Sequence, residues 1–427
     1  MNPHKLLLNS FYAAVAAADP LHIVPGHLPA PPKGRTLVVG AGKAAAAMAL
    51  AVENHWPKNT ALDGLVITRY GHSFPGQNKT GRIQVIEAGH PVPDERGEAA
   101  ARKILAQVKK LGADDLLLCL VSGGGSSLLS LPVAGVSMND LKSVTRELLH
   151  CGAAIQEINT VRKHLSAIQG GRLAASCRAR VLALVISDVT GDDPTHIASG
   201  PCAPDPTTYQ DALSILERYR VNASAAVLET LRVGKQGKRD ETPKPGDACF
   251  RNVENRVIAT AHNSLVAAGE FFRLHGIPAA ILGDSVTGEA RDVAQVYAAL
   301  AKEIRQYGHP WKPPVALISG GETTVTVAGK GRGGRNAEFL LSLAIELDGA
   351  KNIYALACDT DGIDGSENNA GAIAAPDSLQ RAQKLGINAA TLLAGNDAYT
   401  FFENLNDLVV TGPTRTNVND YRVILIR

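Results

Sequence analysis

The chain is poor in aromatic residues and carries almost no excess charge. Of its 427 residues 4% are aromatic, and 43 lysines and arginines nearly balance 41 aspartates and glutamates, for a net charge of +2. Such a chain has neither the electrostatic footprint of a nucleic-acid or membrane-surface protein nor many rings on which bases could stack. It also lacks any run of about eighteen apolar residues, so no membrane span is predicted. We expect a cytoplasmic protein without nucleic-acid or membrane partners.

Several motifs that identify common enzyme and metal-binding classes are missing. The six cysteines form no C-x-x-C pair and no zinc spacing, which predicts free thiols in a reducing compartment. Neither the P-loop pattern G-x-x-x-x-G-K-[ST] nor a G-x-S-x-G elbow around Ser126 or Ser127 is present. At the N-terminus, Asn9 and Ser10 interrupt the apolar run that begins at Leu6, which indicates an amphipathic first helix instead of a signal peptide.

Strand-like and helix-like segments alternate along the chain. The predicted strands are Leu37–Val39, Leu65–Thr68, Ile83–Glu87, Leu116–Val121 and Val181–Ser187 in the first half, and Val257–Thr260, Pro278–Leu282, Val315–Ser319, Val325–Ala328, Ile353–Cys358, Leu408–Val410 and Val423–Ile426 in the second. The predicted helices between them are Lys43–Glu53, Asp94–Leu111, Met138–Leu149, Ile155–Gln169, Ser264–Leu274, Gly288–Tyr307 and Asn336–Leu347. Strands that are apolar on both faces are central strands covered by helices. The pattern therefore predicts an α/β protein whose N-terminal domain is a three-layer sandwich with a mostly parallel sheet.

A second α/β domain is expected after a polar, breaker-rich stretch, Gly234–Gly246, which is typical of an exposed connection. The predicted domains are residues 1–240 and 241–427, with the last strands able to pack back on the first domain. Ligand sites are common where two domains meet, so we expect the active site in the interdomain cleft.

Three glycine-rich turns follow predicted strands. One lies in Leu116–Pro132 and reads SGGGSS, the second lies in Val315–Glu338 and reads SGGETT, and the third is Gly40-Ala-Gly-Lys43. Glycines at strand ends let a backbone approach a ligand closely, and exposed N–H groups can hold anionic oxygens. Together with nearby Lys43, Arg332 and Arg335, these turns predict a polyphosphate site.

The Gly40 turn also fits the dinucleotide pattern G-x-G-x-x-A. That pattern needs an acidic residue at the end of the next strand, but this strand ends Ile67-Thr-Arg-Tyr70, and Asp63 lies at its beginning. A nicotinamide site is therefore disfavoured. The alternative that this turn only packs the helix against the strand stays open. Against it, a lysine at the start of a helix opposes the helix dipole and is better explained by an anionic ligand.

Two groups of carboxylates and two groups of basic residues also follow strands or lie on helices. The carboxylates are Asp188, Asp192 and Asp193 in one group and Asp359, Asp361 and Asp364 in the other. They could hold Mg²⁺ or orient a hydroxyl, or they could cap tight turns. The basic groups are the glycine loop Gly329–Asn336, suited to wrapping a phosphate, and Arg162 with Lys163, which could bind a carboxylate or be solvated. We interpret His90 and His196 as structural.

Nine motifs in order resemble the ATP-dependent glycerate 2-kinases of the class with a C-terminal MOFRL domain. They are VVGAGKAA, GHPVPD, SGGGSS, INTVRKHLSAIQGGRLA, SDVTGDDPTHIASGP, SGGETTVTV, GRGGRNAE, CDTDGIDG and TGPTRTNVND. The resemblance implies a Rossmann-like N-terminal domain, a smaller C-terminal α/β domain, and ATP- and Mg²⁺-dependent phosphorylation of D-glycerate at its 2-hydroxyl. The chain departs from the family pattern at Cys202, Ala337 and Arg415, which bears on substrate preference more than on the reaction.

The resemblance also implies roles for individual residues. Lys43 and Arg335 are similar to the family's principal basic active-site residues, and Asp188 and Asp192 to polar site residues, one of which could take the hydroxyl proton. The expected nucleotide-binding residues are Gly40, Gly42, Ser122, Gly123, Gly124, Gly125, Ser126, Ser319, Gly320, Gly321, Glu322, Arg332, Gly334 and Asn336. The expected substrate-binding residues are Arg162, Lys163 and Ser127, with Arg332 as a second candidate for the glycerate carboxylate, and the expected metal ligands are Asp359, Asp361 and Asp364.

Two other functions stay open. An NAD(P)H-dependent hydroxypyruvate reductase would use the same small acids, and a non-catalytic sugar-acid or nucleotide sensor would bind them without turnover. The residues themselves do not distinguish 2- from 3-phosphoglycerate as the product, and they leave a homo-oligomer open.

Overall fold

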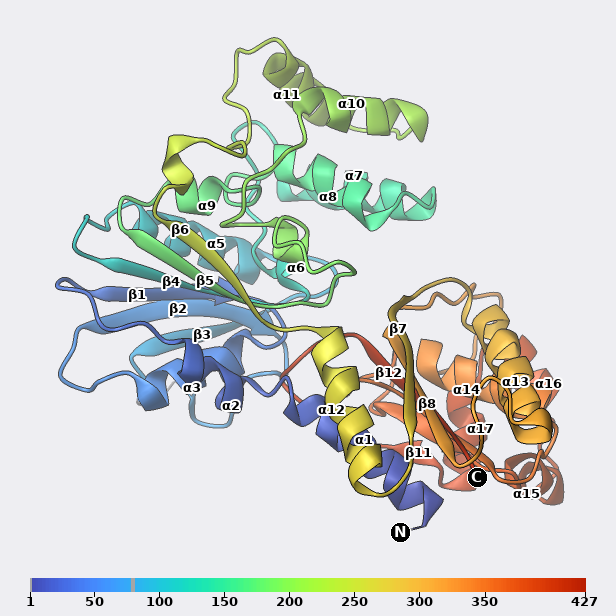
Figure 1. The fold of residues 1–427 in the computed structure, drawn as a ribbon. Helices are drawn as coiled ribbons and strands as arrows, with labels where there is room; N and C mark the ends of the chain where they lie inside the picture. The colour runs from blue at the N-terminus through green and yellow to red at the C-terminus, as the bar shows by residue number, and fades with distance from the viewer. Residues whose placement is uncertain (1, 78–80) are drawn as a thin grey trace. The chain divides into compact units, whose positions relative to one another are not determined.

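The computed structural model describes residues 2–77 and 81–427 (Figure 1). The chain forms two compact units. The N-terminal unit is Pro20–Ile258, and the C-terminal unit is Ala259–Arg427 together with the residues up to Asp19. The polar stretch Gly234–Gly246, on which the predicted domain boundary rests, lies within the N-terminal unit. There the Glu241 carboxylate lies 3.0 Å from the ring Nε2 of His164.

The N-terminal unit is built on a six-stranded sheet of order β3-β2-β1-β4-β5-β6. Its strands are β1 (Thr36–Ala41), β2 (Leu62–Arg69), β3 (Ile83–Ala88), β4 (Leu116–Val121), β5 (Arg180–Ile186) and β6 (Val253–Ala259). All pairings from β3 to β5 are parallel. Both β1 and β4 are completely buried, as continuous apolar runs predict for central strands. This confirms the α/β class and the mostly parallel sheet.

Helices cover both faces of this sheet (Figure 1). One face carries α5 (Glu95–Val108), α6 (Gly125–Leu128) and α9 (Arg172–Ala175), and the other carries α2 (Pro20–Ile23), η1 (Val24–His27) and α3 (Ala45–His55). Four more helices have an apolar core of their own: α7 (Met138–His150), α8 (Ile155–His164), α10 (Tyr209–Arg218) and α11 (Ala225–Lys235). The same unit contains two short 3-10 turns, η2 (Ile197–Ser199) and η3 (Ala248–Phe250). The predicted helix Ile155–Gln169 ends early, at His164.

The C-terminal unit has a mixed sheet of order β11-β10-β9-β12-β8-β7. Its strands are β7 (Ala279–Val286), β8 (Val315–Gly321), β9 (Ile353–Asp359), β10 (Gly371–Ala374), β11 (Leu408–Val409) and β12 (Asp420–Ile426). Strands β7 and β8 are parallel, and the other pairings are antiparallel. The last strand, β12, therefore lies between β8 and β9 in the middle of the sheet.

Two groups of helices cover this second sheet (Figure 1). Helices α1 (Pro3–Ala16) and α12 (Ala261–Leu274) share an apolar core with one face, in which Phe11 contacts Tyr421 of β12. The other face packs against α13 (Ala290–Tyr307), α14 (Arg335–Leu347) and α17 (Ala398–Leu405), with α15 (Ser378–Lys384) and α16 (Ala389–Ala394) at their side. The first helix is thus amphipathic, as predicted, and it buries Leu7 and Phe11.

The predicted strand Val325–Ala328 is wrong. The residue before it, Thr324, forms an isolated bridge with Glu289, and residues 325–328 form no strand. Its amides are bound by side chains: Thr326 N–H donates to the Glu289 carboxylate, and Ala328 N–H donates to the Asn396 amide oxygen. These side-chain acceptors satisfy the backbone amides that a neighbouring strand would otherwise bind, so the segment is stable without strand pairing.

No single helix in the described ranges is long and apolar enough to cross a membrane. One bent pair, Pro3–Ala16 with Pro20–His27, meets the criterion by length and composition only.

Candidate functional site

Two of the predicted glycine turns lie side by side in the N-terminal unit, because β1 and β4 are neighbours in the sheet. The Lys43 N–H donates to the Gly123 carbonyl over 2.8 Å, and the Ala44 N–H donates to the Ser122 hydroxyl over 3.0 Å. The Gly42 N–H donates to the Ile67 carbonyl over 3.1 Å. The backbone donors at the start of this turn are therefore used within the protein, where they join strands and are not directed at a ligand.

The glycines of the Gly40 turn are explained by close packing. A Cβ on Gly40 would lie 2.0 Å from the Leu120 carbonyl oxygen, and one on Gly42 would lie 2.0 Å from the Ser122 hydroxyl. Gly42 also has a φ of +144°, which favours glycine. These three predicted nucleotide-binding residues, Gly40, Gly42 and Ser122, thus hold the two turns together.

The second turn, Gly123–Ser127, keeps donors available. Among the described residues no group accepts a hydrogen bond from the amides of Gly123 and Gly124. Gly124 has a φ of +80°, and a Cβ there would lie 2.9 Å from the His90 ring and 3.4 Å from Lys43 Cγ. The lysine stem and the imidazole thus border the two amides, and this basic corner of the N-terminal unit has the groups that an anion needs.

The serines of this turn and its last glycine are used internally. The Ser127 hydroxyl donates to the Gly124 carbonyl over 3.1 Å, and the Gly125 N–H donates to the Ser122 carbonyl over 3.2 Å. The Ser126 hydroxyl lies 2.8 Å from the Ser199 hydroxyl.

A concentration of positive charge surrounds His90. Burial lowers the pKa of His90 to about 3, together with the charges of four basic neighbours, Lys43, Arg69, His72 and Arg162. The imidazole is therefore neutral at physiological pH. Its buried Nδ1 has no hydrogen-bond partner in the part of the chain that the structure describes.

Arg162 and Lys163, which are adjacent on α8, have different surroundings. The Lys163 side chain is 1% exposed and donates to the Thr195 hydroxyl over 2.8 Å and to the Asp205 carboxylate over 3.4 Å. Among the residues that the structure describes, Arg162 donates to two neutral groups, the Thr145 hydroxyl and the Asn159 amide oxygen. Lys163 therefore has an internal counterion, whereas a ligand-binding role for Arg162 stays a prediction.

The predicted aspartates of this unit lie on the loop after β5. Asp188 is half-buried, and Asp192 has a φ of +54°, in the left-handed region. The Asp193 carboxylate caps the loop by accepting from Thr195 N–H over 2.9 Å. The carboxyl ends of the parallel strands thus carry both the basic corner and this acidic loop.

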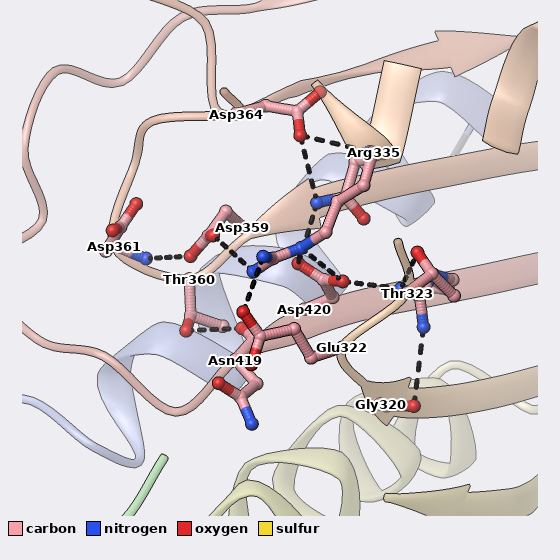
Figure 2. A network of polar contacts seen from close by, with 12 residues as sticks. Gly320, Glu322, Thr323, Arg335, Asp359, Thr360, Asp361, Asp364, Asn419 and Asp420 are labelled. Carbon is pink, nitrogen blue, oxygen red and sulfur yellow. Dashed lines mark hydrogen bonds and ion pairs between the residues drawn. The ribbon is translucent and has the colours of Figure 1, made fainter. Parts of the chain in front are cut away.

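In the C-terminal unit, Arg335 is the centre of a carboxylate network (Figure 2). Its Nε donates to Asp420, its Nη1 to Glu322 over 2.7 Å, and its Nη2 to Asp359 over 2.9 Å. Burial by itself would lower the pKa of Arg335, but these three carboxylates raise it well above the ordinary value. Asp420 also accepts from the buried guanidinium of Arg422. Every nitrogen of the Arg335 guanidinium is therefore engaged by an acid.

The three predicted metal ligands have separate neighbours. Asp364 caps the start of α14 by accepting from the amides of Asn336 and Ala337 over 3.0 and 2.8 Å. Asp361 accepts from Ile363 N–H over 2.8 Å, and Asp359 is paired with Arg335. Across residues 2–77 and 81–427 no group of three or more His, Cys, Asp or Glu side chains is arranged to hold a metal ion. Metal binding by these aspartates stays a prediction.

The remaining predicted residues of this unit surround the same network. Ser319 is buried at the end of β8, the Gly320 carbonyl accepts from Arg422 over 3.4 Å, and Gly321 packs against Val286. A Cβ on Gly334 would lie 2.4 Å from Asp364, so only glycine fits there.

Arg332 is more exposed than Arg335. It is 46% exposed, and it pairs with Glu403 over 2.8 Å and Glu367 over 3.6 Å. Its guanidinium lies over the Tyr399 ring, 4.6 Å from the ring centre. The hydrogen bond that Arg332 donates to Glu403 is the main reason why the pKa of Arg332 is raised.

The structure adds residues that the sequence prediction did not assign. Asp420 and Arg422 complete the network of Arg335, and Asn159, Ser199 and His90 surround the basic corner of the N-terminal unit. Four of the five lie in or directly after motifs already noted. Their roles depend on contacts far apart in the sequence, which no local pattern shows.

Comparison with known proteins extends over the whole chain. Residues 6–232 match the model of a domain of unknown function, DUF4147, and residues 315–420 match the MOFRL family. A protein of Agrobacterium vitis named "Putative hydroxypyruvate reductase" is 50% identical over 429 residues, covering 100% of this chain and 95% of the relative. The "D-glycerate 2-kinase" of Thermotoga maritima is 40% identical, covering 99% of this chain and 98% of the relative. A crystal structure of glycerate kinase from Thermotoga maritima matches with a TM-score of 0.87 at 39% identity, covering 99% of each chain.

Proposed function

This chain belongs to the glycerate kinases of the DUF4147 and MOFRL class, and from that premise we propose that it transfers the terminal phosphate of ATP to the 2-hydroxyl of D-glycerate. The products are 2-phosphoglycerate and ADP. The observation that carries the proposal is the basic corner of the N-terminal unit, where Lys43 borders the unengaged amides of Gly123 and Gly124. Phosphoryl transfer depends mainly on positioning and on neutralising the phosphate charge, and this corner supplies both.

We assign Lys43 and the two glycine amides to phosphate oxygens. Arg335 is the second cation of the proposal. To bind a phosphate, its guanidinium must give up the bond to one of its three carboxylate partners. Of its three acidic partners, Glu322 is 56% exposed, whereas Asp420 and Asp359 are buried. Glu322 is therefore the partner that a phosphate can displace at the lowest cost in desolvation.

The cofactor of the proposal is ATP, and Mg²⁺ accompanies it. The described residues provide no set of three acidic or histidine ligands, which fits an ion held chiefly by the nucleotide phosphates and water. For the proton of the substrate hydroxyl, the loop after β5 offers Asp188 and Asp192 as acceptors. Both assignments follow from the family resemblance and from the position of this loop at the carboxyl end of the sheet.

A hydroxypyruvate reductase is the second candidate, favoured by the name of the 50% identical relative from Agrobacterium vitis. Two features of the N-terminal unit oppose it. Strand β2 ends at Arg69, and Asp63, at its beginning, pairs with Arg35 over 3.3 Å, so β2 itself supplies no acid at the end where the dinucleotide pattern needs one for a ribose. The amides of Gly42 and Lys43 are bound to the protein itself, which removes donors that a pyrophosphate would use.

Two parallel assays on the pure protein test the assignment. In the first, ATP, Mg²⁺ and D-glycerate are mixed and ADP release is followed; enolase without a mutase then reports 2-phosphoglycerate. In the second, NADH and hydroxypyruvate are mixed and NADH oxidation is followed. ADP release with immediate enolase turnover supports the proposal. NADH oxidation without ADP release refutes it in favour of the reductase, and ligand binding without either reaction refutes it in favour of a sensor.

A further inference from the structure

One aromatic ring of the N-terminal unit is exposed at the carboxyl end of its sheet. Tyr70 directly follows strand β2 and is 46% exposed. In the ranges that the structure describes, no other phenylalanine, tyrosine or tryptophan of this unit is exposed. A single exposed ring is ordinary by itself. The way in which Tyr70 is held, and its position next to the basic corner, distinguish it from an average surface side chain.

Hydrogen bonds fix this ring in one place. The Tyr70 hydroxyl donates to the Asp94 carboxylate over 2.7 Å, and Asp94 also accepts from the amides of Gly89 and Gly97, each over 2.9 Å. The Arg96 guanidinium lies over the ring, 5.6 Å from its centre. An exposed ring that is already immobilised loses little conformational entropy when a ligand packs against it, which favours binding.

The chain that follows Tyr70 is also bound to its neighbours. The Glu87 carboxylate of β3 accepts from the Gly71 amide over 3.1 Å, from the Ser73 amide over 3.2 Å and from the Ser73 hydroxyl over 2.7 Å. The side chain of Tyr70 and the backbone after it are therefore both tied to β3 and to the start of α5. This preorganised position does not depend on a ligand.

Tyr70 lies at the same edge of the sheet as the basic corner. The Thr68 hydroxyl, two residues earlier, donates to the Gly42 carbonyl over 3.1 Å, and Arg69 is one of the charged neighbours of His90. Only β1 separates β2 from β4 in the sheet. Because neighbouring strands lie about 4.8 Å apart, the end of β2 is roughly 10 Å from the end of β4. That separation is comparable to the distance between the phosphates of an extended nucleotide and its base.

His90 connects the two places. Its ring lies against Gly124, and the preceding residue, Gly89, donates to the same Asp94 carboxylate that accepts from Tyr70. Helix α6 begins after Gly124 and helix α5 begins after Asp94, and the two helices contact one another on one face of the sheet. A ligand with phosphates on the glycine amides would therefore extend along this face, past His90, to Tyr70.

We propose that Tyr70 stacks on the base of the nucleoside triphosphate whose phosphates occupy the basic corner. The inference rests on the function proposed above and names the group that recognises its phosphate donor. Every nucleobase has a π-face that stacks on an aromatic ring, whereas a small hydroxy acid has none. Val92, which is 57% exposed and lies between His90 and Asp94 in the chain, adds an apolar side chain to the same edge.

Isothermal titration with ATP and with inorganic tripolyphosphate, each with Mg²⁺, tests this assignment, because tripolyphosphate has the phosphates without a base. We expect Tyr70→Leu to weaken ATP binding about 10- to 100-fold and tripolyphosphate binding less than about twofold, since only base stacking is lost. Tyr70→Phe keeps the ring and should bind ATP within about threefold of the wild type. Tyr307→Leu removes a ring of the C-terminal unit that is 61% exposed, and this matched control should change neither affinity.

Three results of these titrations overturn the proposal. The first is unchanged ATP binding in Tyr70→Leu. The second is an equal loss for ATP and tripolyphosphate, which would mean that Tyr70 supports the phosphate corner. The third is a loss in Tyr70→Phe as large as that in Tyr70→Leu, which would assign the effect to the hydroxyl and not to the ring.

Photolabelling of the folded wild type with 8-azido-ATP tests the same site without a substitution. The reactive group is on the purine, so it marks the chain segments next to the base. Label on the segments that contain Tyr70 or Val92, identified by mass spectrometry after proteolysis, supports the proposal. Label that is absent from both segments and present elsewhere overturns it.

The outcomes also distinguish this proposal from the proposed function. A wild type in which ATP binding depends on the Tyr70 ring, but which releases no ADP with D-glycerate, refutes the kinase proposal and leaves the base site standing. ADP release in which Tyr70→Leu keeps the wild-type KM for ATP overturns the base site and leaves the kinase proposal standing. A wild type that binds no ATP refutes both.

Discussion

Asp420 and Glu322 both contact the Arg335 guanidinium, and the structure predicts very different consequences when each is neutralised. The Asp420 side chain is 0% exposed and accepts from Arg335, Asn336 and Arg422. Asp420→Asn would leave two largely buried guanidinium groups facing an amide. Glu322 is 56% exposed and makes one bond to Arg335, so Glu322→Gln is the matched control on the same cation.

The expected magnitudes follow from burial. Breaking a buried ion pair by removing one partner costs about 3–5 kcal/mol, whereas an exposed pair contributes about 0–1 kcal/mol. For a unit of this size each kcal/mol shifts the melting temperature by roughly 2–4 °C. Asp420→Asn should therefore lower the melting temperature of the C-terminal unit by roughly 6–20 °C, and Glu322→Gln by less than about 4 °C.

Differential scanning calorimetry of the full chain, in which the two units can melt as separate transitions, measures both effects. Urea unfolding followed by circular dichroism gives the free energies independently. Equal losses in the two variants, or a loss under about 2 °C for Asp420→Asn, would refute the view that Asp420 holds the network together. The double variant should lose about as much melting temperature as Asp420→Asn alone, because the Glu322 bond has little left to contribute once Arg335 has lost its buried partner.

Three further predictions concern other residues. Lys43→Ala should lower kcat for ATP-dependent phosphorylation of D-glycerate by about 10²–10³-fold, with the exposed Lys58→Ala unchanged in the same coupled assay. Burial raises the pKa of Asp364 to about 7. The folded wild type should therefore lose up to roughly 4 kcal/mol of stability as the pH rises from about 4 through about 7, because the carboxyl group must then ionise in a buried site. Urea unfolding over this pH range should show that loss in the wild type and not in Asp364→Asn. Gly42→Ala should cost about 3 kcal/mol or more in urea unfolding, because of its φ and a 2.0 Å contact, whereas Gly26→Ala, which meets nothing within 4 Å, should cost little.

Much of the fold could be predicted from local pattern. Apolar runs identified β1, β4 and β9 closely, and helical periodicity identified α5, α13 and α14. The α/β class and the parallel first sheet followed. The pattern failed at Val325–Ala328, where side-chain acceptors replace a neighbouring strand, and it did not show that the C-terminal sheet is mixed. The placement of β12 between β8 and β9 depends on pairing with strands that are distant in the sequence.

The candidate site, like the fold, was predictable from the sequence in its local features and not in its tertiary contacts. Glycine and lysine at strand ends are local features, so the sequence by itself determined that Lys43, Gly123 and Gly124 would follow the carboxyl ends of strands. It also placed Arg335 in a basic glycine loop leading into a helix. Only the tertiary structure decided what each polar group contacts. It joined the amide of Lys43 to Gly123, surrounded Arg335 with three carboxylates, and gave Arg162 the neutral partners Thr145 and Asn159. The physical reason is that a hydrogen bond or ion pair needs its partner within a few ångströms, and strand order and burial, which are properties of the whole chain, bring that partner close or keep it away.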